Sequence, residues 1–182
     1  DFESEVPSKD FGAAAVSVDG SGRVVVGLNM SLIPYTGWGN LAYALFFGAL
    51  DDPTSSLSPI LLNHPPDAAF QPSAPHSDRL PHLLLHQAMA REQILLSEES
   101  SLPVIHSVDH EHFDSSKVRG SPNIALIFFD TFRASPALLA AASRRFDCFV
   151  VGSSWNAAML RARGLPRRSK IFTVIQGVDL DV

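Results

Sequence analysis

Hydrophobic residues occur in short unbroken runs along most of the chain, and clusters of Gly, Pro, Ser, Asn and Asp separate these runs. Continuous apolar runs are typical of strands buried on both faces of a parallel sheet, whereas apolar residues three or four positions apart indicate helices. We expect strands at Val24–Leu28, Pro59–Asn63, Val104–Val108, Ile124–Phe129, Cys148–Val151 and Ile171–Ile175, and helices at Leu41–Leu50, Pro81–Ser97, Ser135–Phe146 and Ser154–Arg163. Alternation of strand and helix predicts an α/β fold with a Rossmann-like, doubly wound, mostly parallel sheet.

The amino-terminal segment has a different pattern. Two apolar runs, Ala13–Asp19 and Arg23–Asn29, flank Gly20-Ser21-Gly22, which predicts a hairpin or an edge strand. We therefore divide the chain into an entry segment, residues 1–22, and one Rossmann-like domain, residues 23–182. The first residue is not Met, so we expect a segment of a longer protein or a processed chain.

Composition narrows the class of protein. Of the 182 residues, 46% are hydrophobic and 18% charged, which supports a sizeable core and excludes a disordered tail. The net charge of −5 does not fit a general nucleic-acid binder or a protein held to anionic lipid by charge alone. A single cysteine, which we expect to be an inert thiol, excludes an internal disulfide framework and favours a reducing compartment. No apolar run is long enough to span a membrane, so we expect a cytoplasmic protein with peripheral membrane contact at most.

Specific motifs appear in the last third of the chain. Asp147–Asn156 passes from an apolar strand into a helix through Ser-Ser-Trp-Asn, and Ile171–Asp179 is a strand ending in Gln-Gly-Val-Asp. Ile127–Thr131 adds a strand that ends in Asp-Thr, and Gly37–Asn40 adds a glycine-rich segment after the first strand. Together these motifs resemble the amino-terminal domain of the family-four glycosyltransferases, which are built from two Rossmann-like domains facing across a cleft (the GT-B architecture). The family carries Asn at the position of Gln176.

The resemblance implies the amino-terminal, acceptor-side half of a retaining glycosyltransferase. Its co-substrate would be a nucleotide diphosphate sugar, and its acceptor a sugar, a lipid or a small molecule. A donor-binding domain would follow this chain, with Gly177, Val178 and Asp179 at the interdomain hinge. We therefore expect the chain alone to be inactive and to bind no cofactor or metal. The alternative is a stand-alone Rossmann-like interaction module without catalysis.

The segment Gly37, Trp38, Gly39 and Asn40 is the candidate donor-phosphate loop that the resemblance implies. Backbone amides in a glycine-rich loop, together with a helix amino terminus, can bind an anion. An ordinary turn and a dinucleotide fingerprint are the alternatives, although the loop is long for that fingerprint. We expect close approach of a ligand to Gly39, with a positive φ, so that Gly39→Val impairs transfer but leaves the fold nearly intact.

The remaining candidates are polar residues near strand ends. His106 and Asp109 are candidate cleft residues, and even spacing of His106, His110 and His112 leaves zinc ligation or a polar loop as alternatives. Asp130 is either a cleft carboxylate or the cap of the next helix.

The turn after Val151 holds Ser153, Ser154 and Trp155, which the resemblance places beside the cleft. A serine here imitates a hydrolase nucleophile elbow, but Asn156 stands where that motif needs Gly. We therefore expect Ser153 or Ser154 to cap a helix. The basic residues of the last third form either a solvated helix face or a contact with an anionic lipid or phosphorylated acceptor; they are Arg144, Arg145, Arg161, Arg163, Arg167, Arg168 and Lys170.

Overall fold

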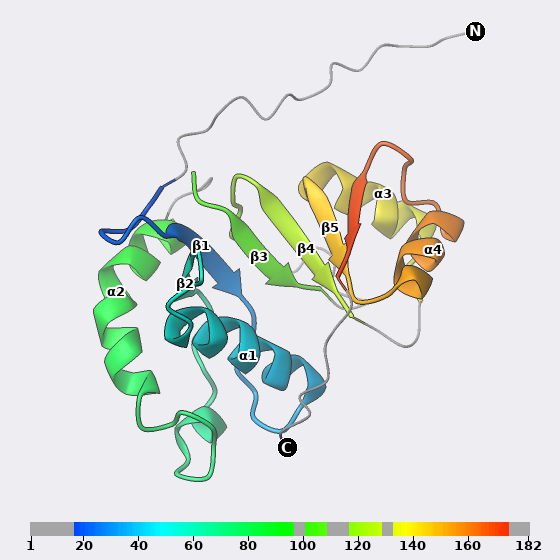
Figure 1. The fold of residues 1–182 in the computed structure, drawn as a ribbon. Coiled ribbons are helices and arrows are strands. Elements are labelled where there is room, and N and C mark those ends of the chain that lie inside the picture. The colour runs from blue at the N-terminus through cyan, green and yellow to red at the C-terminus, as the bar shows by residue number, and fades with distance from the viewer. Residues whose placement is uncertain (1–16, 97–100, 109–116, 129–132, 175–182) are drawn as a thin grey trace, which may run out of the picture.

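The computed structural model describes residues 17–96, 101–108, 117–128 and 133–174. These residues form an α/β fold in which one six-stranded, all-parallel sheet is flanked by helices (Figure 1). The strands are β1 (Val24–Asn29), β2 (Leu57–Leu61), β3 (Val104–Ser107), β4 (Asn123–Ile127), β5 (Cys148–Val151) and β6 (Lys170–Thr173). The helices are α1 (Gly37–Asp51), α2 (Leu80–Leu96), α3 (Pro136–Arg145) and α4 (Ser154–Ala162), with a short 3-10 helix at Asp67–Phe70.

The strand order is β2-β1-β3-β4-β5-β6, and each neighbouring pair is parallel. The predicted Rossmann-like sheet is thereby confirmed, as is the expectation that the four strands after residue 100 are neighbours. From β1 the chain turns one way to β2 and then crosses back to β3, so β1 and β3 form the topological switch point. In the described part of the entry segment, Val18 forms an antiparallel bridge with Val24, which fits the predicted hairpin.

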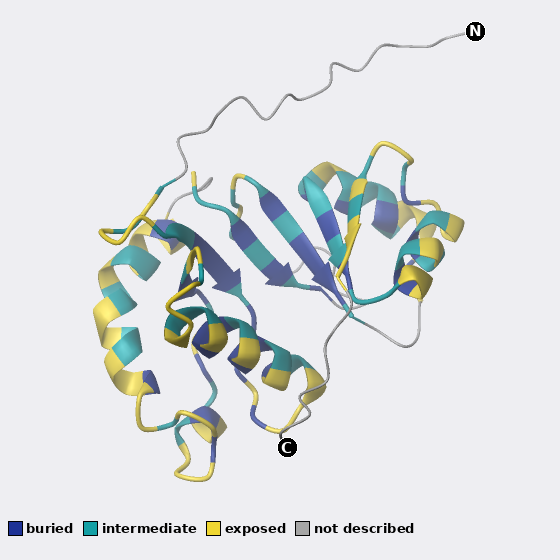
Figure 2. Ribbon diagram, viewed as in Figure 1, coloured by how far each residue is buried: buried dark blue, intermediate teal, exposed yellow. Residues whose placement is uncertain are grey.

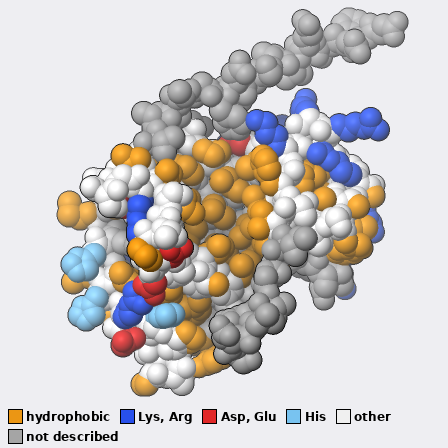
Figure 3. Space-filling view, in the orientation of Figure 1, with side chains coloured by type: hydrophobic (Ala, Val, Ile, Leu, Met, Phe, Trp, Pro, Cys, Tyr) orange, Lys and Arg blue, Asp and Glu red, His pale blue; other side chains and the backbone are white. Residues whose placement is uncertain are grey.

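The two faces of the sheet are covered by different helices. Leu28 of β1 and Leu61 of β2 pack with α1, whereas Ile60 and Val104 pack with α2 on the opposite face. We call the first the α1 face and the second the α3 face, because α3 and α4 also pack on that second face. Strands β3, β4 and β5 are visible without a helix in front of them (Figure 1), and hydrophobic side chains fill this area in the space-filling view (Figure 3).

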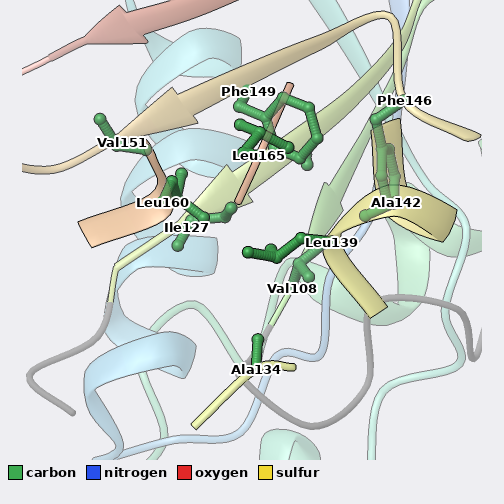
Figure 4. Packing of buried hydrophobic residues seen from close by; sticks show 11 residues of the cluster. Val108, Ile127, Ala134, Leu139, Ala142, Phe146, Phe149, Val151, Leu160 and Leu165 are labelled. Carbon is green, nitrogen blue, oxygen red and sulfur yellow. The ribbon is translucent and has the colours of Figure 1, made fainter. Parts of the chain in front are cut away.

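The largest clusters of buried residues lie one on each face of the sheet, and Figure 2 marks the buried stretches of β3, β4 and β5 in dark blue. Ile127, Phe149 and Val151 project from β4 and β5 and are fully buried against Leu139 of α3 and Leu160 of α4 (Figure 4). This packing explains the apolar residues at alternate positions of β4 and β5, because those side chains point into the layer formed by α3 and α4. None of the helices in the described ranges has the length and apolar character needed to cross a membrane.

Candidate functional site at the carboxyl edge of the sheet

The carboxyl ends of all six strands meet at one edge because the sheet is entirely parallel. Open α/β sheets bind ligands at this edge, in the crevice at the switch point. Here the switch point brings the segment after β1, with the amino terminus of α1, beside the ends of β3 and β4. This edge is therefore the candidate site.

The first turn of α1 supplies backbone amides to the edge. Thr36 caps the helix: its Oγ1 accepts a hydrogen bond of 3.0 Å from the Gly39 amide and donates one of 3.0 Å to the Ile33 carbonyl. Within the described residues, the amides of Gly37 and Trp38 make no hydrogen bond. These two amides and the positive end of the helix can receive an anion.

The structure corrects the predicted position of the glycine-rich segment. We expected a loop before a helix beginning at Leu41, but residues Gly37 to Asn40 form the first turn of α1. The reason is the Thr36 cap, which starts the helix earlier than the hydrophobic pattern indicates.

Gly39 is required by packing inside the chain. A Cβ atom at this position would lie 1.6 Å from the Ile33 carbonyl oxygen and 2.8 Å from Thr36 Oγ1. Gly39 does not have a positive φ; in the described ranges the glycines with positive φ are Gly22 and Gly164. The expectation that Gly39→Val leaves the fold nearly intact is therefore wrong, because any side chain here collides with backbone.

Aromatic packing ties α1 to the ends of β4 and β5. The rings of Trp38 and Phe128 lie edge to face with centroids 6.2 Å apart. Gly152 follows β5 and lies so close to Phe128 that a Cβ atom would come 2.1 Å from its Cδ1. Trp38, Phe128 and Gly152 thus join three elements at the carboxyl edge.

The turn from β5 into α4 carries the second helix amino terminus at this edge. The Ser153 hydroxyl accepts a hydrogen bond of 3.1 Å from the Asn156 amide and donates one of 2.9 Å to Asn156 Oδ1. The interpretation of this turn as an N-cap is confirmed for Ser153. Ser154 and Trp155 are exposed in the first turn of α4.

His106 lies inside the sheet, on its α3 face, and is 2% exposed. Its Nδ1 is 2.8 Å from Nδ2 of Asn29 in β1, and its Nε2 is 2.7 Å from Oδ1 of Asn123 in β4. The Asn123 side chain donates through Nδ2 to the Arg145 carbonyl and accepts the Gly120 amide on Oδ1. Asn123 Oδ1 is therefore an acceptor, so His106 Nε2 carries the proton and Nδ1 accepts from Asn29.

This network keeps the imidazole neutral. Burial lowers the pKa of His106 to about 4, the hydrogen bond that its Nε2 donates to Asn123 acts in the opposite direction, and the nearby Arg145 lowers the pKa further. Both ring nitrogens are used between strands, so His106 has none left for a sugar hydroxyl in this arrangement. Its evident role is to join β1, β3 and β4 beside the switch point. Neither asparagine was singled out from the sequence, although each is a polar residue beside or within an apolar run.

Several predicted site residues lie outside the described part of the chain. These are Asp109, Asp130, Gly177, Val178 and Asp179, together with His110 and His112 of the proposed zinc alternative. Among the residues that the structure does describe, no three His, Cys, Asp or Glu side chains gather as a metal site. Burial raises the pKa of the half-buried Cys148 thiol, and Asp147 raises it further, which disfavours the reactive thiolate.

Comparison of the chain with family models, with curated proteins and with solved structures finds no match. The all-parallel sheet and its strand order place the chain in the class of Rossmann-like α/β domains.

Proposed function

We propose that the chain is the amino-terminal, acceptor-side half of a nucleotide-sugar-dependent glycosyltransferase. The reaction is transfer of a sugar from a nucleotide diphosphate donor to a hydroxyl group of a sugar, lipid or small-molecule acceptor, with retention at the anomeric carbon. The observation that carries the proposal is the meeting of two helix amino termini, those of α1 and α4, at the carboxyl edge of one parallel sheet. The motifs that resemble the family include both of these helix starts.

The chemical role of this half is to stabilise the departing diphosphate and to present the acceptor. The amides of Gly37 and Trp38 point from the end of α1 and match the need for preorganised donors where negative charge develops. On the other side of the edge, Ser154 offers an exposed hydroxyl and Trp155 an exposed ring. These are the groups we assign to the acceptor, whereas the base and sugar of the donor would bind a second domain.

A binding module without catalysis is the second candidate. The observation that favours it is the hydrophobic area left without a helix on the α1 face of the sheet, which is typical of interaction surfaces (Figure 3).

Replacement of Gly37 by Pro tests the diphosphate role, because proline lacks the amide hydrogen. The position suits proline: it is the first residue of the helix, a Cβ atom there has open space, and Thr36 before it is extended with ψ 153°. We expect Gly37→Pro to keep the thermal stability and to weaken UDP or GDP binding about tenfold or more, the effect of one lost charge-assisted hydrogen bond. Gly37→Ala, which keeps the amide, is the matched control and should bind as the wild type.

Titration of the 15N-labelled chain with UDP, GDP and their glucose and mannose conjugates locates the site. We expect the largest shifts at the amides of Gly37 and Trp38, and no transfer by this chain alone. Shifts confined to other parts of the chain, or equal binding by Gly37→Pro and Gly37→Ala, would refute the diphosphate role. Efficient transfer by the 182-residue chain would show that the donor site has been misplaced.

A further inference from the structure

The two faces of the sheet differ sharply in exposure from β3 to β6. On the α3 face, Val104, Ala125 and Phe149 are fully buried. On the α1 face, exposure rises along the row that crosses the same strands: Leu126 of β4 is buried, Val150 of β5 is partly exposed, and Phe172 of β6 is 54% exposed. Helix α1 explains the difference, since the hydrophobic cluster beneath it includes Leu28 of β1 and reaches Val150 of β5, but contains no residue of β6.

The uncovered area is hydrophobic along two rows that cross the strands. We call it the open face and define it by the apolar α1-face residues of β3 to β6, which are Ile105, Ile124, Leu126, Cys148, Val150 and Phe172. The polar residues Ser107 and Lys170 occupy the other two positions of these rows. A sheet face that evolved to meet water carries polar side chains at such positions. Contiguous apolar area of this kind marks a surface that meets another molecule, and Figure 3 shows it as one hydrophobic zone.

The dimensions of the open face suit one α-helix. Four adjacent strands at about 4.8 Å spacing span roughly 14 Å, and a helix with its side chains is about 10 Å wide. Helix α1 already packs on the neighbouring strands β1 and β2 of the same face. A second helix could lie beside it at the usual separation of about 8–10 Å.

Charge at the border of the open face specifies the partner further. Lys170 pairs in register with Cys148 and projects from the same face of the sheet. Arg167 and Arg168 precede it in an exposed turn. The open-face rows and the turn at 166–169 contain no Asp or Glu, although Asp147 lies beside Cys148 at the start of β5. A helix that lies here is stabilised by acidic residues on the flank that faces β6.

We propose that the open face is a docking surface for an amphipathic helix of a partner protein, whose apolar side covers Val150 and Phe172 and whose acidic flank meets Arg167 and Arg168. The partner helix completes the second layer that a parallel sheet requires. This role is independent of sugar transfer, because the open face lies across the strands and not at their carboxyl edge.

A synthetic helix tests the proposal. The probe is a fluorescent amphipathic peptide of about 18 residues, roughly 27 Å long, with leucines on one side and glutamates on the flanks. A second peptide carries lysines in place of the glutamates. We expect the wild-type chain to bind the acidic peptide at least tenfold more tightly than the basic one, measured by fluorescence anisotropy.

Variants link this binding to the open face. The double change Val150→Thr with Phe172→Thr removes apolar area but keeps strand propensity, and it should weaken binding of the acidic peptide at least tenfold. The matched control is Leu85→Gln with Met89→Gln, because both residues are highly exposed hydrophobics on α2 and should not affect binding. Arg167→Glu with Arg168→Glu should reverse the preference between the two peptides. Circular dichroism melting confirms that each variant is folded.

Three results would overturn the proposal. The first is equal affinity for both peptides, or equal binding by the open-face and control variants. The second is binding to phosphatidylglycerol vesicles that depends on Val150 and Phe172 without any peptide preference, which would assign the surface to a membrane. The third is concentration-dependent dimerisation in sedimentation that the same double variant abolishes, which would assign it to a second copy of the chain.

Discussion

Acidification is a direct test of the buried His106 network. The imidazole is neutral in the folded chain, where its pKa is about 4. When the chain unfolds, the pKa returns to about 6.5. Between these two values the unfolded chain binds more protons than the folded one, so the free energy of unfolding falls as the pH falls. The contribution of His106 is complete above pH 6.5 and is lost progressively down to about pH 4.

The magnitude follows from the size of the pKa shift. A difference of about 2.5 units at about 1.4 kcal/mol per unit gives a total of about 3 kcal/mol. At pH 5 about 2 kcal/mol of this is already lost by the same linkage. The carboxyl groups of Asp51 and Asp52 have pKa values below the usual 3.8, held there mainly by hydrogen bonds from Arg79 and Thr54 respectively. Their contribution is lost only as the pH falls below that value, so His106 dominates between pH 7.5 and 5.

Urea unfolding at pH 7.5 and pH 5.0 measures this difference. We expect the wild type to lose about 2 kcal/mol, whereas His106→Gln, which can still bond Asn29 and Asn123, should have a lower but nearly pH-independent stability. In an NMR titration the His106 ring signals should stay those of the neutral imidazole at pH 5. Equal losses in wild type and variant, or a protonated His106 at pH 5, would show that the network does not hold the ring neutral.

Much of the fold could be predicted because buried strands have a strong pattern. The apolar run at Cys148–Val151 predicted β5 with the same bounds that the structure shows. The run at Ile124–Phe129 predicted β4, although the strand begins one position earlier at Asn123. A pattern of apolar residues cannot show that a polar residue such as Asn123 belongs to the strand, because its burial depends on a partner in another strand.

The candidate site was less predictable because it depends on contacts between distant segments. The sequence suggested a cleft-facing role for His106, but its position is decided by Asn29 and Asn123, which lie on neighbouring strands. The existence of the open face was also not predicted from the sequence. Apolar strands indicate burial on both faces, and only the paths of the connecting helices show which face stays uncovered.

Three substitutions and one control test the local structure at helix ends and turns, and each is measured as a change in the free energy of unfolding by urea. Ser153→Ala removes the cap of α4 and should cost about 1 kcal/mol. Gly164→Ala forces a side chain into a backbone with φ +101° and should cost at least about 1 kcal/mol, although the nearest atom, on Pro136, leaves room for a methyl group. Gly39→Ala should have the largest effect, on the order of 3 kcal/mol, because its Cβ atom would lie 1.6 Å from the Ile33 carbonyl oxygen, so the segment before α1 must move. Gly37→Ala lies in the same helical turn with open space around its Cβ atom and should change stability by less than about 0.5 kcal/mol. Glycine at position 39 is therefore required for the stability of the fold. Ligand binding by Gly39→Ala has to be compared with that of the wild type at equal folded fraction. If the Gly39 and Gly37 variants are equally stable, the close approach to Ile33 does not exist in solution, and Gly39 again becomes a candidate for direct contact with a ligand.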